Sequence, residues 1–329
     1  MPLTADQMYR QFTWNQRLLQ LAFLILVVLV SIAISKVSSS TGRATLQKTP
    51  QGVMGTSCML RVVVKPQDLQ RAEALLADAE RELRQCEALT STWIETSEIS
   101  RFNRAKAGEK IELSPFTMEF LKLAKQAWMD TDGAFDITCG KVWQLWLEGQ
   151  KKNALPDMDE IQRLRAESNW ENIELGENFA VKRNDHVEVV SGGLAKGMAI
   201  DRALEILKAG GVLSAFVEVG GDIAVFQNTR PIQVKASKDR TSECVSEIAN
   251  FENGGICTSG HSERGFEIQG TRYSQILDPT TGRPVETPWS VTVTADCAVT
   301  ADLWATALEV LGEKGAEKLP SGVNVVEIQ

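Results

Sequence analysis

A long apolar run lies near the N-terminus, between Leu18 and Ile34, where only Gln20 and Ser31 are polar. A run of this length is at the short end of what can cross a hydrocarbon core roughly 30 Å thick. A signal-peptide core is usually shorter, and a buried helix rarely lacks a polar face over so many residues. The pattern therefore favours an uncleaved membrane anchor, with a cleaved signal and a buried helix as alternatives.

Polar and small residues follow the apolar run, and they set the expected domain boundaries. We expect an N-terminal segment over 1–17, a transmembrane anchor or signal over 18–36, a tether over 37–51 and a globular domain over 52–329. The tether is predicted because its residues are small and polar. The sequence Val-Ser-Ser directly after the run also fits a signal-peptidase site, so cleavage stays an alternative.

The first half of the globular region alternates between strand and helix patterns. Met54–Val64 is rich in β-branched residues and is predicted as the first strand. Gln67–Leu89 has helical periodicity, whereas Trp93–Asn103 is predicted as a loop with short turns. Ser114 and Pro115 fit an N-cap and a first-turn proline, so a helix is expected to begin there. Its apolar face comprises Phe120, Leu123, Ala124 and Ala127.

The second half contains more strands, with two helices among them. Asp185–Val190 and Val212–Val219 are predicted strands, and others follow through residue 270 and over Trp289–Thr294. A glycine turn ending at Gly193 leads into a helix that Gly210 and its neighbour stop. The buried face of that helix comprises Ile200, Ala203, Leu204 and Leu207.

A final helix is predicted to be capped by Thr300 and ended by Gly312. Its buried face comprises Trp304, Ala307, Leu308 and Leu311. Strands and helices are mixed along the chain and no internal repeat is present. The pattern therefore predicts an α+β fold, or mixed α/β, in a single compact domain behind the N-terminal anchor.

Composition and charge narrow the possible functions. The 329 residues are 43% hydrophobic and 24% charged, as in globular proteins, and the net charge of −8 without a basic run argues against a nucleic-acid partner. Only two histidines are present, so a metal site must use mainly oxygen ligands, which favours Mg²⁺ or Ca²⁺ over Zn²⁺. The six cysteines contain no CxxC pair, and we expect buried free thiols, with disulfides as the alternative.

Two short segments place glycines and polar residues at the ends of predicted elements. In Asp132–Thr138, Gly133 permits close approach of the backbone to a ligand, and Phe135 could pack against a planar ring. In Ser191–Gly197, helix-start amides and Lys196 form a reasonable pyrophosphate site, although the glycine spacing fits neither a Walker A loop nor a dinucleotide fingerprint. For each segment taken alone, an ordinary structural turn is the favoured interpretation.

A third segment places two oxygen-bearing side chains on one predicted helix. Asp302 and Thr306 are four residues apart and therefore share one helical face. A carboxylate and a hydroxyl arranged in this way can bind a hard cation together. The alternative is an Asp in the capping turn and a packed Thr.

Together, and in this order, the motifs resemble those of the ApbE-type FAD:protein FMN transferase family. The resemblance covers roughly residues 50–313, nearly all of the globular region. The motifs that carry it are MGT at 54–56, SEISRFN at 97–103, GAFDIT at 133–138, AKG at 195–197, GGD at 220–222, TSG at 258–260, ILDPTTGRPV at 276–285 and ADLWATALEVLG at 301–312.

The resemblance implies an activity and a set of site residues. Such enzymes bind FAD with Mg²⁺ and transfer FMN to a threonine hydroxyl of an acceptor flavoprotein, releasing AMP. By resemblance, Asp302 and Thr306 bind Mg²⁺ with help from a backbone carbonyl near Gly193, and Gln275 and Asp302 occupy catalytic positions. The implied flavin site comprises Met54, Trp93, Ala134, Phe135, Asp136, Lys196 and Ile276. Phosphoryl transfer depends mainly on charge neutralisation and alignment, which a metal on a pyrophosphate supplies.

Two positions depart from the family pattern. The family usually has an acidic residue where this chain has Val190, and histidine where it has Gln275. Glutamine cannot accept a proton at neutral pH, although it can donate a hydrogen bond or orient a hydroxyl. His261, which follows the TSG motif, is an alternative base. Two alternatives to transfer therefore stay open: a flavin pyrophosphatase, in which water attacks, and a flavin-binding protein without turnover.

The anchor and the usual export of this family predict where the protein works. We expect a single-pass protein of the inner (cytoplasmic) membrane, with its catalytic domain on the extracytoplasmic, periplasmic side. The expected partners are the membrane, through the N-terminal helix, and an acceptor flavoprotein that carries the target threonine.

Overall fold

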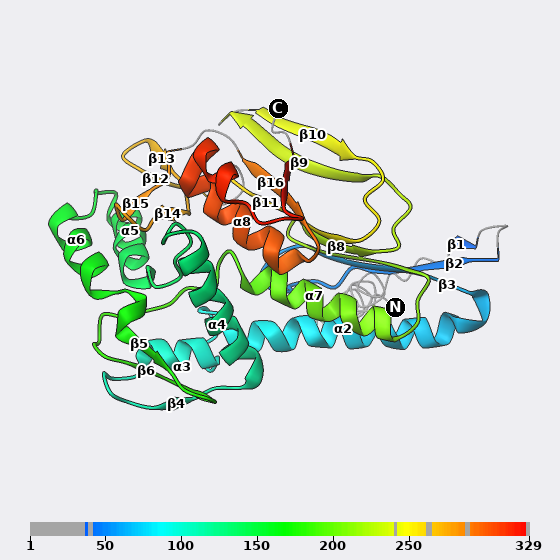
Figure 1. Cartoon of the computed structure of the whole chain (residues 1–329), viewed down its shortest axis with the longest axis horizontal. Helices are drawn as coiled ribbons and strands as arrows, with labels where there is room; N and C mark the ends of the chain where they lie inside the picture. The colour runs from blue at the N-terminus through cyan, green and yellow to red at the C-terminus, as the bar shows by residue number, and fades with distance from the viewer. Residues whose placement is uncertain (1–36, 39–41, 240–241, 261–264, 287–289, 327–329) are drawn as a thin grey trace, which may run out of the picture.

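The computed structural model describes residues 37–38, 42–239, 242–260, 265–286 and 290–326 (Figure 1). The anchor predicted over 18–36 lies outside these residues. Within the described ranges, none of the helices combines the length and the apolar character needed to cross a membrane.

An eight-stranded antiparallel sheet forms the centre of the fold, in the order β1-β2-β3-β7-β8-β11-β16-β17. Successive side chains of a strand point to opposite faces, so Leu60 and Val62 pack on one face of the sheet and Met59 on the other. The strands are β1 Val37–Ser38, β2 Ala44–Lys48, β3 Cys58–Val64, β7 Ser214–Val219, β8 Asp222–Phe226, β11 Gly254–Ser259, β16 Val291–Ala295 and β17 Asn324–Val326.

Helices α2 (Leu69–Thr90), α7 (Ala195–Ala209) and α8 (Ala298–Leu311) cover one face of the sheet (Figure 1). The buried residues of α2 recur every three or four positions, as an amphipathic helix requires. A close crossing of α7 and α8 depends on Gly197, where an added Cβ would lie 2.6 Å from the Cα of Val299. This crossing brings the N-terminal ends of both helices to the same region of the molecule.

The opposite face of the sheet is covered by a two-stranded ribbon of β9 (Ile232–Asp239) and β10 (Ser242–Ile248), drawn in yellow-green and yellow in Figure 1. An apolar cluster joins the ribbon to the sheet, and its buried members are Phe216, Ile223, Val225, Ile232, Val234 and Ile256. The centre of the sheet is therefore buried on both faces.

The remaining elements form a lobe beside the sheet, on the left in Figure 1. Its helices are α3 Glu98–Arg104, α4 Pro115–Asp130, α5 Gly140–Lys152 and α6 Met158–Glu167. Its small sheets are β4 Ile111–Glu112 with β6 Phe179–Lys182 and β5 Ile173–Leu175, β12 Phe266–Ile268 with β13 Thr271–Tyr273, and β14 Leu277–Asp278 with β15 Arg283–Pro284. Short 3₁₀ helices are η1 Pro66–Asp68, η2 Trp170–Asn172 and η3 Gly312–Lys318.

The α+β prediction is confirmed, as are the helices expected after Ser114 and after the glycine turn. The tether predicted over 37–51 is corrected, because β2 lies inside it and buries Ala44 and Leu46 in the core. The first long strand begins at Cys58 and not at Met54.

Three further predictions of local structure were wrong. The segment 93–103 contains α3, whose N-cap Ser97 accepts a hydrogen bond from the amide of Ser100. Asp185–Val190 forms no strand, and only Glu188 makes a single bridge. Thr300 does not cap α8, because the helix already begins at Ala298.

The five cysteines whose side chains the structure describes agree with the expectation of free thiols. Cys58, Cys86 and Cys257 are free and buried, and Cys139 and Cys297 are free and half-buried.

Candidate functional site

A cavity of about 1020 Å³ opens between the main sheet and the lobe. Its walls include the ends of α2, α7 and α8, the start of α5, and part of β9. Every residue predicted for the site lines this cavity: Met54, Trp93, Ala134, Phe135, Asp136, Gly193, Lys196, Gln275, Ile276, Asp302 and Thr306. The structure therefore brings together residues from segments that are far apart in the sequence, while their individual roles stay predictions.

Met54 reaches the cavity on a tight turn. Met54 and Gly55 have φ angles of 50° and 68°, and the amide of Thr56 donates to the carbonyl of Val53 over 3.1 Å. Two successive positive φ angles are typical of a type I′ turn, and a methionine in this conformation is strained. The β7–β8 turn packs on it, since a Cβ at Gly220 would lie 2.8 Å from the Cγ2 of Thr56.

The turn after α4 fixes the residues from Ala134 to Asp136. The hydroxyl of Thr131 accepts a hydrogen bond of 2.9 Å from the amide of Phe135, whose ring is almost completely buried. The carboxylate of Asp136 accepts hydrogen bonds of 2.8 Å from the amide and from the hydroxyl of Thr138. Burial nevertheless outweighs these bonds and raises the pKa of Asp136 to about 6.

Lys196 and two buried aspartates form the charged part of the site. The ammonium of Lys196 makes an ion pair with Asp222, which also accepts a 3.3 Å hydrogen bond from the amide of Thr258. Asp302 accepts a 3.0 Å hydrogen bond from the amide of Gly197, in the first turn of α7. Both aspartates are buried, so the cluster carries an excess of negative charge beside one cation.

These contacts shift the protonation of the cluster. Burial, and then the charge of Asp222, raises the pKa of Asp302 to about 7, although Lys196 and the Gly197 amide favour its charged form. Burial alone would lower the pKa of Lys196, but the two carboxylates outweigh it and raise that pKa above its ordinary value. The cluster therefore favours a second positive charge close to Asp302.

Oxygen atoms gather next to Asp302 at one corner of the cavity. The hydroxyl of Thr306 lies 3.2 Å from the hydroxyl of Ser259. Gly193, with φ of 76°, brings the backbone so close that an added Cβ would lie 2.8 Å from the Oγ1 of Thr306. A carboxylate, hydroxyls and a backbone turn in one corner are the donors that a hard cation such as Mg²⁺ prefers.

The histidine, cysteine and carboxylate side chains do not build a metal site by themselves. Among the residues that the structure describes, no group of three or more of these side chains could hold a metal ion. A cation at Asp302 would therefore need hydroxyl, backbone or substrate oxygens as further ligands, which is the arrangement that the sequence predicts.

The two departures from the family pattern also line the cavity. Val190 lies immediately before the glycine turn, and the exposed Gln275 and the following Ile276 lie directly before β14. The backbone amide of Ile276 donates a 3.0 Å hydrogen bond to the hydroxyl of Ser274, which fixes the position of Ile276. His186 lies elsewhere, with its Nε2 3.4 Å from a Glu167 oxygen, and His261 is outside the described residues.

Two polar residues of the site were not assigned a role from the sequence. Asp222 is the partner of Lys196, and Ser259 is the neighbour of Thr306. Both stand in motifs that the sequence offers, GGD and TSG. Their roles could not be read there, because they depend on β8 and β11 lying side by side in the sheet.

Comparison with known proteins gives this site a context. A curated relative from Vibrio cholerae named FAD:protein FMN transferase is 32% identical over 79% of this chain and 80% of its own length. A relative of the same name from Klebsiella pneumoniae is 31% identical over 81% of this chain and 79% of its own length.

Solved structures agree with these relatives. The flavin transferase ApbE from Vibrio cholerae superposes with a TM-score of 0.73 at 27% identity, over 85% of this chain and 92% of that one. The ApbE protein from Thermotoga maritima has a TM-score of 0.72 at 30% identity, over 85% of this chain and 93% of that one. The model of the ApbE family matches residues 54–326. This chain therefore belongs to the ApbE family.

Proposed function

We propose that this protein is an FAD:protein FMN transferase that uses Mg²⁺ and transfers FMN from FAD to a threonine hydroxyl of an acceptor flavoprotein, with release of AMP. The observation that carries the proposal is the convergence of Lys196, Asp302 and Thr306 on the glycine turn, inside a cavity of about 1020 Å³. A volume of this order suits a ligand as large as a dinucleotide. The family relatives named FAD:protein FMN transferase support the same reaction.

The two ends of the cavity suit the two parts of FAD. Lys196 and the glycine turn before α7 are proposed to contact the diphosphate, since a cation and a helix start both attract phosphate. The amide of Gly197 already donates to Asp302, so it is not counted among the phosphate contacts. Met54, Trp93 and Ile276 offer apolar surface for the flavin rings, and Trp93 is 85% exposed at the cavity rim.

Asp302, Thr306 and a carbonyl of the glycine turn are proposed to hold Mg²⁺. The bound metal would neutralise diphosphate charge and align it for displacement. In the reaction, the threonine Oγ forms a bond to the phosphorus on the FMN side. The bond from that phosphorus to the bridging oxygen breaks, and AMP leaves with the electron pair. Lys196, which lines the cavity, is proposed to stabilise charge on the phosphates during this step.

The hydroxyl proton of the acceptor needs a separate destination. Gln275 cannot accept it, so we propose that the proton passes to the phosphate of the leaving AMP or to water. The Gln275 amide can orient the hydroxyl or donate to a phosphate oxygen. General-base help is typically worth about 100- to 10,000-fold, whereas positioning and electrostatics often supply more. We therefore propose that transfer proceeds with Gln275 as an orienting residue, at a lower rate than a base would allow.

Product analysis with and without acceptor separates this function from its alternatives. The protein is incubated with FAD and Mg²⁺, and AMP and free FMN are quantified by chromatography. A transferase releases AMP only when the acceptor is present and yields no matching amount of free FMN. A pyrophosphatase releases AMP and FMN in equal amounts without acceptor. A binding protein releases neither, and that result would remove the enzyme proposal.

We also propose that the catalytic domain works on the extracytoplasmic, periplasmic side of the inner membrane, anchored by the apolar segment over 18–36. The support is the sequence pattern of that segment. An anchor of this kind would keep the domain close to acceptor flavoproteins of the same membrane.

A further inference from the structure

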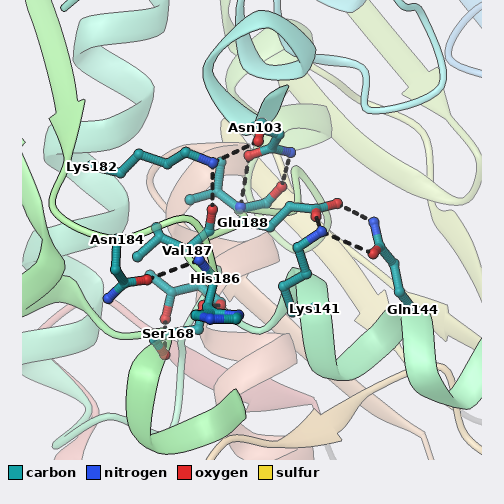
Figure 2. A network of polar contacts seen from close by, with 11 residues as sticks. Asn103, Lys141, Gln144, Ser168, Lys182, Asn184, His186, Val187 and Glu188 are labelled. Atoms are coloured by element: carbon teal, nitrogen blue, oxygen red, sulfur yellow. Dashed lines mark hydrogen bonds and ion pairs between the residues drawn. The ribbon is translucent and has the colours of Figure 1, made fainter. Parts of the chain in front are cut away.

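The segment that leads into the glycine turn is extended but lacks a neighbouring strand. Val187 and Val189 are completely buried, and within the described residues the segment makes one isolated bridge, between Glu188 and Cys139. Buried backbone groups must find hydrogen-bond partners. In this segment, side chains supply several of those partners that a neighbouring strand would otherwise provide (Figure 2).

Asn103 pairs with the segment through both ends of its side-chain amide. Its Oδ1 accepts a 2.9 Å hydrogen bond from the amide of Val189, and its Nδ2 donates 2.8 Å to the carbonyl of the same residue. This two-bond exchange is the pattern by which a β-strand neighbour would hold Val189. Asn103 therefore fixes the position of Val189 along the segment, at the end of α3.

Lys182 connects the backbone of Asn103 to the same segment through hydrogen bonds. Its ammonium is buried and donates 2.7 Å to the carbonyl of Asn103 and 3.1 Å to the carbonyl of Val187 (Figure 2). A cation at the C-terminal end of a helix is favourable, because the last carbonyls of α3 lack partners within the helix. Burial lowers the pKa of Lys182, and the charges of Asp185 and Glu188 oppose that shift.

The start of α5 holds the other side of the segment. The amide of Gly140 donates 2.9 Å to the carbonyl of Glu188, and Lys141 makes a 2.8 Å ion pair with the Glu188 carboxylate, which Gln144 also contacts (Figure 2). An added Cβ at Gly140 would lie 2.7 Å from the Glu188 carbonyl oxygen. The segment is thus clamped between α3 and α5.

The segment held between α3 and α5 ends at Val190, directly before the glycine turn of the candidate site. The amide of Val190 donates 2.8 Å to the carbonyl of Ile137, and the next residues, Ser191 to Gly193, line the cavity. The backbone at Gly193 lies so close to α8 that an added Cβ would lie 2.8 Å from the Oγ1 of Thr306. The register of the clamped segment therefore sets the position of the glycine turn against α8.

We infer that Asn103 is a positioning residue for the phosphate end of the site: through Val189 it sets the glycine turn that contacts the diphosphate, and Lys182 holds it there. This inference rests on the proposed function, because it assumes that the turn contacts the FAD phosphates. It predicts that loss of the Asn103 pairing impairs binding of the diphosphate and spares binding of the flavin rings.

The test is Asn103→Asp, which keeps the size of the side chain but replaces the donor to the Val189 carbonyl with an oxygen. Binding of FAD and of riboflavin is measured by tryptophan fluorescence and calorimetry, beside melting curves. We expect FAD affinity to fall at least tenfold while riboflavin affinity stays within twofold, because only FAD carries the diphosphate that the displaced turn would contact.

Asn172→Asp is the matched control. The side-chain amide of Asn172 donates a 3.0 Å hydrogen bond to the carbonyl of Glu167. The residue is half-buried like Asn103, but it does not line the cavity. It should lower the melting temperature without changing the ratio of FAD to riboflavin affinity. Asn103→Ser, which is smaller and uncharged, replaces the first variant if Asn103→Asp fails to fold.

The outcomes separate the inference from the proposed function. Equal weakening of FAD and riboflavin in the Asn103 variants, or no weakening of either, overturns the positioning role while FAD binding by the unmodified protein still supports the function. If the unmodified protein binds riboflavin but gains nothing from the diphosphate and adenosine of FAD, the proposed function fails and the inference fails with it. A selective loss of FAD in Asn103 variants alone supports both.

Discussion

Replacing Gly193 with alanine should damage the site more than it damages the fold. Gly193 has a φ of 76°, in the left-handed region, where an L-residue other than glycine costs roughly 1–2 kcal/mol. The new Cβ would lie 2.8 Å from the Oγ1 of Thr306 and 3.0 Å from the Cε2 of Phe135. Carbon atoms do not approach other heavy atoms so closely, so the turn or α8 must move by a few tenths of an ångström.

The expected magnitudes follow from these two effects. Overpacking typically costs about 1–3 kcal/mol, so with the backbone strain the variant should lose roughly 2–5 kcal/mol of unfolding free energy. For a domain of this size, a loss of that order lowers the melting temperature by roughly 3–9 °C. Because a misplacement of about 1 Å can cost on the order of 100-fold in rate, we expect kcat/KM for transfer to fall about 10- to 100-fold at temperatures where the variant is folded.

The assay compares Gly193→Ala with Gly270→Ala by melting curves and by AMP release with acceptor. Gly270 has a φ of 77°, an added Cβ there would meet nothing within 4 Å, and the residue does not line the cavity, so its alanine variant should share the backbone strain but keep the transfer rate. Adding Thr306→Ala to Gly193→Ala should restore part of the melting temperature without restoring activity, since it removes one of the two close contacts. Unchanged transfer in Gly193→Ala, or an equal loss of transfer in Gly270→Ala, would refute this reasoning.

Three further predictions test the charges, the missing base and the location. Lys196→Ala should weaken FAD binding more than riboflavin binding, whereas Lys208→Ala, at the exposed end of the same helix, should leave both unchanged; equal weakening by Lys196→Ala would remove that residue from the phosphate end. Gln275→His should raise the transfer rate at least tenfold, with activity rising near neutral pH as the imidazole loses its proton; a flat pH profile and an unchanged rate would show that no base is missing there. Protease added to intact spheroplasts should digest the catalytic domain, and full protection would place that domain in the cytoplasm.

The sequence predicted the site better than it predicted the elements around it. Asp302 and Thr306 were placed on one helical face by their spacing alone, and α8 confirms that arrangement. The glycine turn before Lys196 was predicted for the same reason, because a turn and a helix start are local features. These signals depend on residues within one or two turns of each other, and the fold does not alter them.

Other features depend on contacts that a local pattern does not contain. The stretch from Asp185 to Val190 alternates like a strand, yet its partners are Asn103, Lys182 and the start of α5. Thr300 has the chemistry of an N-cap, but the amides of Ala298 and Val299 donate 2.8 Å hydrogen bonds to the half-buried carboxylate of Asp201 on α7. In each case a side chain distant in sequence satisfies the backbone, so the local pattern gave the wrong element.

The tether shows the same limit at the domain boundary. Residues 44–48 are partly small and polar. Ala44 and Leu46 face the core, whereas Thr45 between them is only half-buried. Two buried side chains are too weak a signal to predict a strand, and β2 forms because β3 offers it an edge along five residue pairs. The ion pair of Lys196 with Asp222 could not be predicted either, because it depends on β8 lying beside α7, which no local pattern shows.

The account's central claim is that Asp302 and Thr306 organise transfer of FMN to a threonine of another protein. The most direct measurement is the intact mass of an acceptor domain after incubation with FAD, Mg²⁺ and this protein, with Asp302→Ala and an acceptor lacking the target threonine as controls. We predict that one FMN is added through a phosphoester, that chelation of Mg²⁺ or Asp302→Ala abolishes the addition while the variant stays folded, and that the acceptor without its threonine stays unmodified. An unmodified acceptor with the unmodified protein, although FAD is bound, or an addition unaffected by Asp302→Ala and by chelation, would contradict the claim.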